Sequence, residues 1–109
     1  MKEIKAIIRP ERLPTVLQAL HDMPQLPGVT VSHVRGFGRQ FPPEKGGETF
    51  AAVDMAKLEI VVPTELAMEV VGTIERAAHT GHVGDGKIVM LPVEHAVKVR
   101  SGERDGSAL

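Results

Sequence analysis

The stretch KLEIVVPTELAMEVVGTIERAA, residues 57–78, decides the fold class, because it joins a strand directly to a helix. Its first six residues alternate, and the alternation predicts a strand with one buried face. The apolar residues on that face are Leu58, Ile60 and Val62. Pro63 ends the strand, and Thr64 is expected as the N-cap of the helix. The apolar stripe of the helix consists of Leu66, Val70, Val71, Ile74, Ala77 and Ala78.

The first half of the chain has a strand, a helix and a second strand in the same order. Residues 2–9 alternate as a strand, and residues 13–23 have the spacing of an amphipathic helix, with Pro14 in its first turn. Residues 29–34 are rich in β-branched side chains and predict another strand. With a last strand at 88–91, the order is βαββαβ. We therefore predict an α+β, ferredoxin-like domain with an antiparallel sheet.

Apolar residues also occur on the sheet face that the two helices leave open. Ile7, Val61 and Val89 lie on this second face if the strands alternate as predicted. A second covering is therefore expected, and homo-oligomerisation is a natural way to supply it.

Composition narrows the class of protein. The 109 residues suit one domain, 1–109, and the net charge of −1 provides no basic field for nucleic acid. Aromatic residues make up 3%, too few for a base-stacking platform, and the lack of cysteine excludes disulfides and thiolate sites. No stretch approaches the length of a membrane span, so we expect a cytoplasmic protein that does not insert into a membrane.

Residues 80–87, TGHVGDGK, form a glycine-rich segment that is called the glycine loop below. Glycines let backbone N–H groups converge on an anion, and Lys87 adds a positive charge. The spacing from Gly81 to Lys87 matches a phosphate loop, but Ile88 stands where Ser or Thr would hold Mg²⁺. The loop also leads from a helix to a strand, which is the reverse order. Taken alone, it also fits a glycine C-cap followed by a turn.

Two further segments combine glycine with basic residues. Residues 36–40, GFGRQ, begin a long loop that extends to residue 56, and long loops in compact domains are often functional. Residues 97–99 are expected as a short strand, which would place Lys98 and Arg100 on one strand face. Alone, these segments also fit a bent strand end and a solvated edge strand.

Histidines and carboxylates give little support to catalysis. His79 and His82 are three residues apart and could bind a metal if the helix continues, although a histidine at a helix C-terminus also suits the helix dipole. A metal-responsive trimer of related fold is therefore an alternative hypothesis. No serine lies in a nucleophile motif, and Asp85 has no obvious second carboxylate. We expect no catalytic residues and no main enzymatic role.

Several segments, taken in order, resemble the signatures of the PII signal transduction proteins. They are VRGFGRQ at 34–40, TGHVGDGKI at 80–88 and RSGER at 100–104, with IKAIIRP at 4–10 and EIVVP at 59–63. The resemblance spans almost the whole chain except the long loop. It implies a homotrimer that binds ATP or ADP in clefts between subunits. It also implies a T-loop at about 38–56, a B-loop at 80–87 and a C-loop at 98–104.

The resemblance also implies roles for individual residues. The phosphate ligands implied by position are Gly38, Arg39, Gly84, Asp85, Gly86, Lys87, Lys98 and Arg100. Lys98 stands where the family usually has arginine, so the charge is kept and the bidentate fork is lost. Thr30 and Val61 would line the adenine side. Gln40 stands where the family places a Mg²⁺ ligand that is used when 2-oxoglutarate binds.

The long loop departs from the family pattern. The family's T-loop reports the bound nucleotide to a partner, which for this chain is expected to be a membrane transporter or a regulatory enzyme. That loop usually carries a tyrosine that is modified with a nucleotide, and this chain has no tyrosine. Met55 stands where the family has a lysine that contacts 2-oxoglutarate. The resemblance therefore implies a divergent member with a shortened T-loop.

Overall fold

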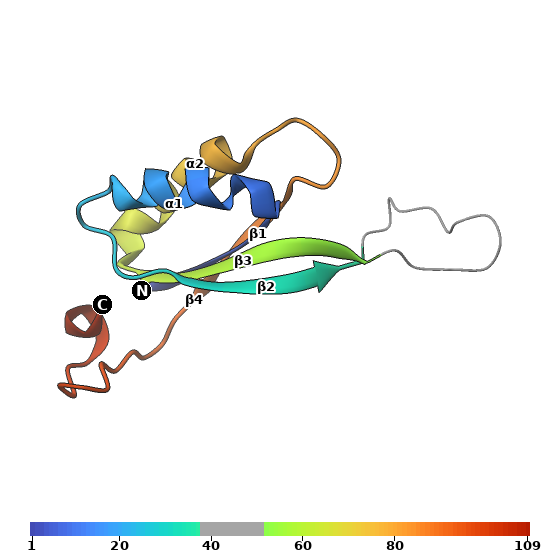
Figure 1. The fold of residues 1–109 in the computed structure, drawn as a ribbon. Helices are drawn as coiled ribbons and strands as arrows, with labels where there is room; N and C mark the ends of the chain where they lie inside the picture. The colour runs from blue at the N-terminus through green and yellow to red at the C-terminus, as the bar shows by residue number, and fades with distance from the viewer. Residues whose placement is uncertain (38–51) are drawn as a thin grey trace.

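The computed structural model describes residues 1–37 and 52–109 (Figure 1). The four strands are β1 (Lys2–Ile8), β2 (Thr30–Gly36), β3 (Val53–Val62) and β4 (Gly86–Pro92). The two α-helices are α1 (Leu13–His21) and α2 (Thr64–Ala78). Short 3₁₀ helices are η1 (Pro10–Arg12) and η2 (Asp105–Ala108).

The strands form one antiparallel sheet in the order β2-β3-β1-β4. Both helices lie on the same face of this sheet, as Figure 1 shows. The chain therefore has the predicted α+β, ferredoxin-like fold. No helix in the described ranges combines the length and the apolar character that a membrane crossing requires.

The core lies between the helices and the sheet. One face of β1 and β3 supplies the strand residues, and the apolar stripes of α1 and α2 supply the rest. The largest fully buried side chains are Ile4, Ile8, Val16, Leu20, Leu58, Ile60, Val62, Val70 and Ile74. The predicted stripes are therefore confirmed, because each of these residues lies at a position that the periodicity assigns to the core.

The helix ends are fixed by contacts between distant segments. Pro14 lies in the first turn of α1, as predicted. Arg12 donates from Nε at 3.0 Å and from Nη2 at 2.6 Å to the carbonyl oxygen of Ala77, which satisfies one of the unpaired carbonyls at the end of α2. The predicted N-cap role of Thr64 was wrong. Pro63 is the capping residue, and the Thr64 hydroxyl instead accepts a hydrogen bond from the Met1 ammonium at 3.0 Å.

The second face of the sheet is open in the single chain. Ile7, Val61 and Val89 all lie on it, since Ile7 is paired with Lys57 and Lys87, and Val61 and Val89 follow the same alternation. Val89 is 38% exposed. We call this surface, formed by the outward residues of the four strands, the open sheet face.

Two boundaries differ from the sequence prediction. β3 begins at Val53 rather than at residue 57, because Gly36 and Arg35 of β2 pair with Val53 and Asp54 and extend the ribbon. The long loop predicted to extend to residue 56 is therefore too long at its end. Residues 97–99 do not form a strand. Val97 forms only an isolated bridge with Arg104, and residues 99–101 turn between them.

Candidate functional site

The glycine loop connects the end of α2 to the start of β4. His79 leaves the helix in an extended conformation, and positive φ angles of 86°, 95° and 108° follow at Gly81, Gly84 and Gly86. Such angles favour glycine, because a Cβ would clash with the local backbone. Gly86 is also a point of close approach, where a Cβ would lie 1.8 Å from the carbonyl oxygen of Ile7. The glycines are therefore required by the path of the loop.

Asp85 organises the interior of this loop. Its Oδ2 accepts hydrogen bonds from the N–H groups of Thr80 at 2.8 Å and Gly81 at 2.9 Å, and its Oδ1 accepts from the Thr80 hydroxyl. The bond from the Thr80 hydroxyl and the next largest, from Arg9, hold the pKa of Asp85 well below its usual range. The carboxylate is therefore ionised and occupied. A contact between Asp85 and a phosphate stays a prediction. Because both carboxylate oxygens are already hydrogen-bonded within the protein, such a contact would have to be made by the backbone of Asp85.

Arg9 lies beneath the loop at the end of β1. Its Nε donates to Asp85 Oδ1 at 2.9 Å, and its Nη2 donates to the carbonyl oxygen of Val83 at 2.6 Å. A Cβ placed on Gly84 would lie 3.4 Å from Nη2, so the guanidinium lies directly against Gly84. The arginine therefore connects the sheet to the loop through two bonds.

A hollow lies beside the loop, between α2 and β4. It has a volume of about 410 Å³, and Asp85, Gly86 and Lys87 line it together with His79 and Glu75. The structure thus gathers three of the predicted phosphate ligands around one depression. Gly84 lies in the adjoining turn of the loop.

The histidine pair does not have the geometry that the metal hypothesis needs. α2 ends at Ala78, so His79 and His82 are not on one helix face. Their nearest polar neighbours also differ. His79 Nδ1 lies 3.9 Å from Asp85 Oδ2, whereas His82 Nδ1 lies 3.3 Å from the Thr80 hydroxyl. Within residues 1–37 and 52–109, no group of three His, Cys, Asp or Glu side chains could hold a metal ion.

A second cavity, of about 660 Å³, lies at the other end of the sheet. Three predicted site residues line it, namely Thr30, Val61 and Lys98. The other lining residues are Glu3, Pro27, Gly28, Glu59, Ala108 and Leu109. The structure therefore brings the two predicted adenine-side residues together with one predicted phosphate ligand.

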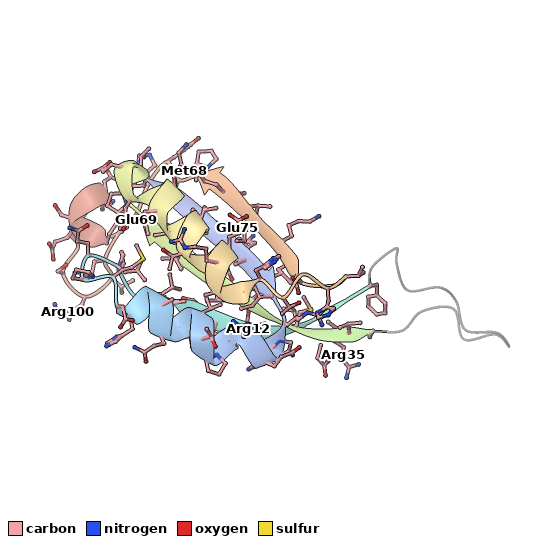
Figure 2. All side chains as sticks on the ribbon, turned by 90° about the horizontal axis from the view of Figure 1, so that it is seen from above. Arg12, Arg35, Met68, Glu69, Glu75 and Arg100 are labelled. Atoms are coloured by element: carbon pink, nitrogen blue, oxygen red, sulfur yellow. The ribbon has the colours of Figure 1, made fainter. Side chains whose placement is uncertain are left out.

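Lys98 and Arg100 belong to a C-terminal hairpin rather than to a strand. The Lys98 N–H donates to the Glu103 carbonyl, and the Gly102 N–H donates to the Lys98 carbonyl, both at 2.8 Å. Lys98 Nζ lies 4.0 Å from the Glu103 carboxylate. Arg100 is in the exposed turn, so the expectation that Lys98 and Arg100 share a strand face was wrong. Figure 2 shows Arg100 at the end of the molecule opposite Arg35.

The two halves of the predicted site lie at opposite ends of the same strands. Gly86 is paired with Ile8, whereas Glu3, which lines the second cavity, is five residues away along β1. That separation is about 17 Å for a strand. Figure 1 shows the glycine loop before β4 at one end of the sheet and the C-terminal hairpin at the other. A single chain therefore does not bring Lys87 and Lys98 to one ligand.

Three predicted site residues, Gly38, Arg39 and Gln40, lie outside the described residues. Two other residues were missed by the sequence reasoning. Arg9 had no assigned role, although antiparallel pairing of the first and last strands would have placed it under the glycine loop. Glu59 alternates with the core residues of its strand, so it could have been placed on the open sheet face, where it is paired with Thr30.

Comparisons with known proteins identify the family of the chain. The family model described as nitrogen regulatory protein P-II matches residues 1–103. The chain belongs to the PII family. It is 41% identical to the nitrogen regulatory protein P-II of Azospirillum brasilense, and both chains are covered completely. The P-II 1 protein of Escherichia coli strain K12 is also 41% identical over the full length of both chains.

A solved structure of a PII protein has the same fold. The crystal structure of Arabidopsis thaliana PII bound to citrate matches with a TM-score of 0.83 and 42% identity. The match covers 99% of this chain and 91% of the Arabidopsis chain. The resemblance read from the sequence is therefore confirmed, and this PII protein is a nitrogen-regulatory signalling protein by family.

Proposed function

We propose that this PII protein is a homotrimer that binds ATP or ADP between its subunits. The bound state would be reported by the T-loop to a partner, either a membrane transporter or a regulatory enzyme, in the cytoplasm. The protein itself would perform no catalytic step as its main role. The residues proposed to bind the nucleotide are those that the resemblance to the PII family implies.

The observation that carries this proposal is the separation of the two half-sites. The glycine loop with Lys87 lies at one end of β1, and the cavity with Thr30 and Lys98 lies at the other. A ligand that contacts both halves must therefore lie between two chains. In a ring of three chains, each glycine loop could face the cavity of its neighbour.

The open sheet face supports the trimer. Val89 and Leu91 are 38% and 37% exposed in the single chain. Burying apolar surface of this kind against a second copy is favourable, and identical chains usually form closed symmetric assemblies. Three sheets that pack through this face would bring the two ends of neighbouring chains together.

The chemistry of the two halves suits a nucleotide. Lys87 and the glycine backbone can bind phosphate oxygens, and charge-assisted bonds of this kind are among the stronger hydrogen bonds in proteins. The second cavity offers the apolar side chain of Val61 and the hydroxyl of Thr30 for a base. The Arabidopsis relative is described as bound to citrate, which is also a small polyanion.

Mg²⁺ is expected only together with the phosphates. Proteins usually bind Mg²⁺ through one or two side chains plus the phosphates of the ligand. We propose Gln40 for that role from the resemblance alone. The metal-responsive alternative receives no support from His79 and His82, because the helix ends before both of them.

Isothermal titration with ATP, ADP and GTP tests the proposal. We expect saturable binding of ATP or ADP with one site per chain, and much weaker binding of GTP. Sedimentation of the same samples should give three times the chain mass of 11.8 kDa. Absence of binding by both adenine nucleotides at millimolar concentration would contradict the proposal. ATP turnover above about 1 s⁻¹ would contradict the non-catalytic role.

A further inference from the structure

The Arg9 side chain joins the end of β1 to the glycine loop, at Val83 and Asp85. We propose that Arg9 is a positioning residue that holds the glycine loop in the conformation that accepts phosphate. The inference rests on the proposed nucleotide function. It adds a residue that acts through Val83 and Asp85 rather than by touching the ligand.

Arg9 fixes the direction of one peptide group in the glycine loop. Arg9 Nη2 donates to the Val83 carbonyl at 2.6 Å, so that carbonyl points down toward the sheet. The Gly84 N–H belongs to the same planar trans peptide and points the opposite way. It therefore points away from Arg9, toward the outer side of the loop. Within the described residues, the Gly84 N–H has no hydrogen-bond partner.

Several N–H groups of the glycine loop are already bound within the loop. Those of Thr80 and Gly81 are bound to Asp85, and that of His82 is bound to the Thr80 hydroxyl at 3.2 Å. The first part of the loop is therefore satisfied internally. Gly84, which the Arg9 contact orients, remains as a backbone donor that can meet an anion.

Arg9 also places a positive charge beside Asp85. Asp85 is ionised and lies in the middle of a loop that is proposed to bind phosphates, which it would repel. Arg9 Nε lies 2.9 Å from Asp85 Oδ1 and offsets this charge. The Arg9 side chain is only 25% exposed, so solvent replaces its contribution poorly. Removing Arg9 would therefore release the Val83 carbonyl and also take away the guanidinium charge beside Asp85.

The test compares Arg9→Met with the unchanged full-length protein. Methionine keeps most of the apolar stem and removes both bonds and the charge. We expect the Kd for ATP and for ADP to rise about tenfold, the loss of one good charge-assisted bond. Binding of adenosine, followed by NMR shifts at millimolar concentration, should be unchanged because adenosine has no phosphate. The Kd of Arg9→Lys, which can make one of the two bonds, should lie between the values of Arg9→Met and the unchanged protein.

Arg12→Met is the matched control. Arg12 also makes two hydrogen bonds through Nε and Nη2, but both reach the Ala77 carbonyl at the end of α2. We expect Arg12→Met to lower the melting temperature without changing the ratio of ATP to adenosine affinity. If Arg9→Met behaves in that same way, or leaves ATP affinity unchanged, Arg9 has only a structural role and the inference is wrong.

A double-variant cycle separates positioning from direct contact. If Arg9 acts through Asp85, the double variant Arg9→Met, Asp85→Asn should bind ATP no more weakly than Arg9→Met alone. Additive losses would mean that Arg9 acts independently of Asp85, and the part of the inference that runs through Asp85 would be wrong. If the unchanged protein binds no adenine nucleotide, the proposed function is wrong. The role proposed for Arg9 is then wrong as well.

Discussion

Gly86 approaches the backbone of Ile7 so closely that a Cβ on Gly86 would lie 1.8 Å from the Ile7 carbonyl oxygen. The contact occurs where β4 begins to pair with β1, and Gly86 has a φ of 108°. The start of β4 is therefore possible only with glycine at this position. The position of the glycine loop depends on the same contact.

Replacing Gly86 with alanine should destabilise the fold. The new Cβ would force the two strands apart and would hold alanine at an unfavourable φ, so we expect a loss of about 3 kcal/mol in the free energy of unfolding. Urea denaturation followed by circular dichroism measures it. Gly106→Ala is the matched control, because nothing lies within 4 Å of its Cβ position, and it should change stability by less than about 0.5 kcal/mol. Equal effects of the two changes would contradict the prediction.

The ionisation of Asp85 should make stability depend on acid pH. Its pKa is depressed in the folded protein, so its contribution is fully present above the ordinary Asp value of 3.8 and is lost as pH falls below that value. The difference in melting temperature between the unchanged protein and Asp85→Asn should therefore be largest near about pH 7 and should narrow below about pH 4.

A matched carboxylate change serves as the control for that series. Asp54 lies on β3 and is paired with Arg35 of β2; its Oδ1 lies 3.6 Å from Arg35 Nε, and its side chain is 83% exposed. Asp54→Asn should change the melting temperature much less at neutral pH, because exposed ion pairs contribute little. A gap between the unchanged protein and Asp85→Asn that stays constant from neutral to acid pH would count against a role for the ionised carboxylate.

Removing the amine of Lys87 should weaken nucleotide binding through the phosphates. We expect Lys87→Ala to lose about 1.5–3 kcal/mol of ATP binding energy, or roughly 10- to 150-fold in Kd, as for one charge-assisted hydrogen bond. Calorimetry measures the change. Arg76→Ala, an exposed change on α2, is the control and should leave the affinity as it was. If Lys87→Ala binds ATP normally, the glycine loop is not the phosphate site.

A charge on the open sheet face should separate the subunits. In a free chain, the glutamate of Val89→Glu can pair with Lys5, its neighbour across β1 and β4, so the fold should survive. In a trimer that buries this face, the same carboxylate loses its hydration at a large cost. We expect sedimentation to show single chains and calorimetry to show lost ATP binding.

The control for that change carries the same charge on the opposite side of the molecule. Met68 lies on α2, which covers the other face of the sheet, and its side chain is 70% exposed. Met68→Glu should keep both the assembly and the nucleotide affinity. If Val89→Glu forms single chains that still bind ATP, the site would be complete within one chain, contrary to the proposed function.

The sequence allowed prediction of the elements whose residues alternate or repeat clearly. β1, α1 and α2 were predicted to within a few residues, because their apolar spacing is regular and proline marks their ends. The start of β3 was missed, since Asp54, Met55 and Ala56 show no alternation and are held in the strand by pairing with β2. At Val97 and Val99 the sequence predicted a strand that the structure does not have. They alternate as strand residues do, but Val99 lies in a turn and is 97% exposed.

The candidate site was predictable as segments and not as an arrangement. Glycine content and charge identified the glycine loop, and the resemblance added Thr30, Val61 and Lys98, which line one cavity. The bonds from Arg9 to Val83 and Asp85 were not predictable from spacing, because they join residues more than 70 positions apart. These bonds depend on β1 and β4 being neighbours in the sheet, which the spacing of residues along the chain does not show.

The central place of β1 in the sheet has a consequence for how the molecule forms. β1 is made first during synthesis, yet both of its partners, β3 and β4, come later, and the second ends at Pro92. The core of the sheet can therefore close only when most of the chain is available. Contacts of such long sequence separation slow folding. Until β4 has been synthesised, one edge of β1 has no partner strand, and the growing chain can pair wrongly at that edge. In the complete protein β4 covers this edge.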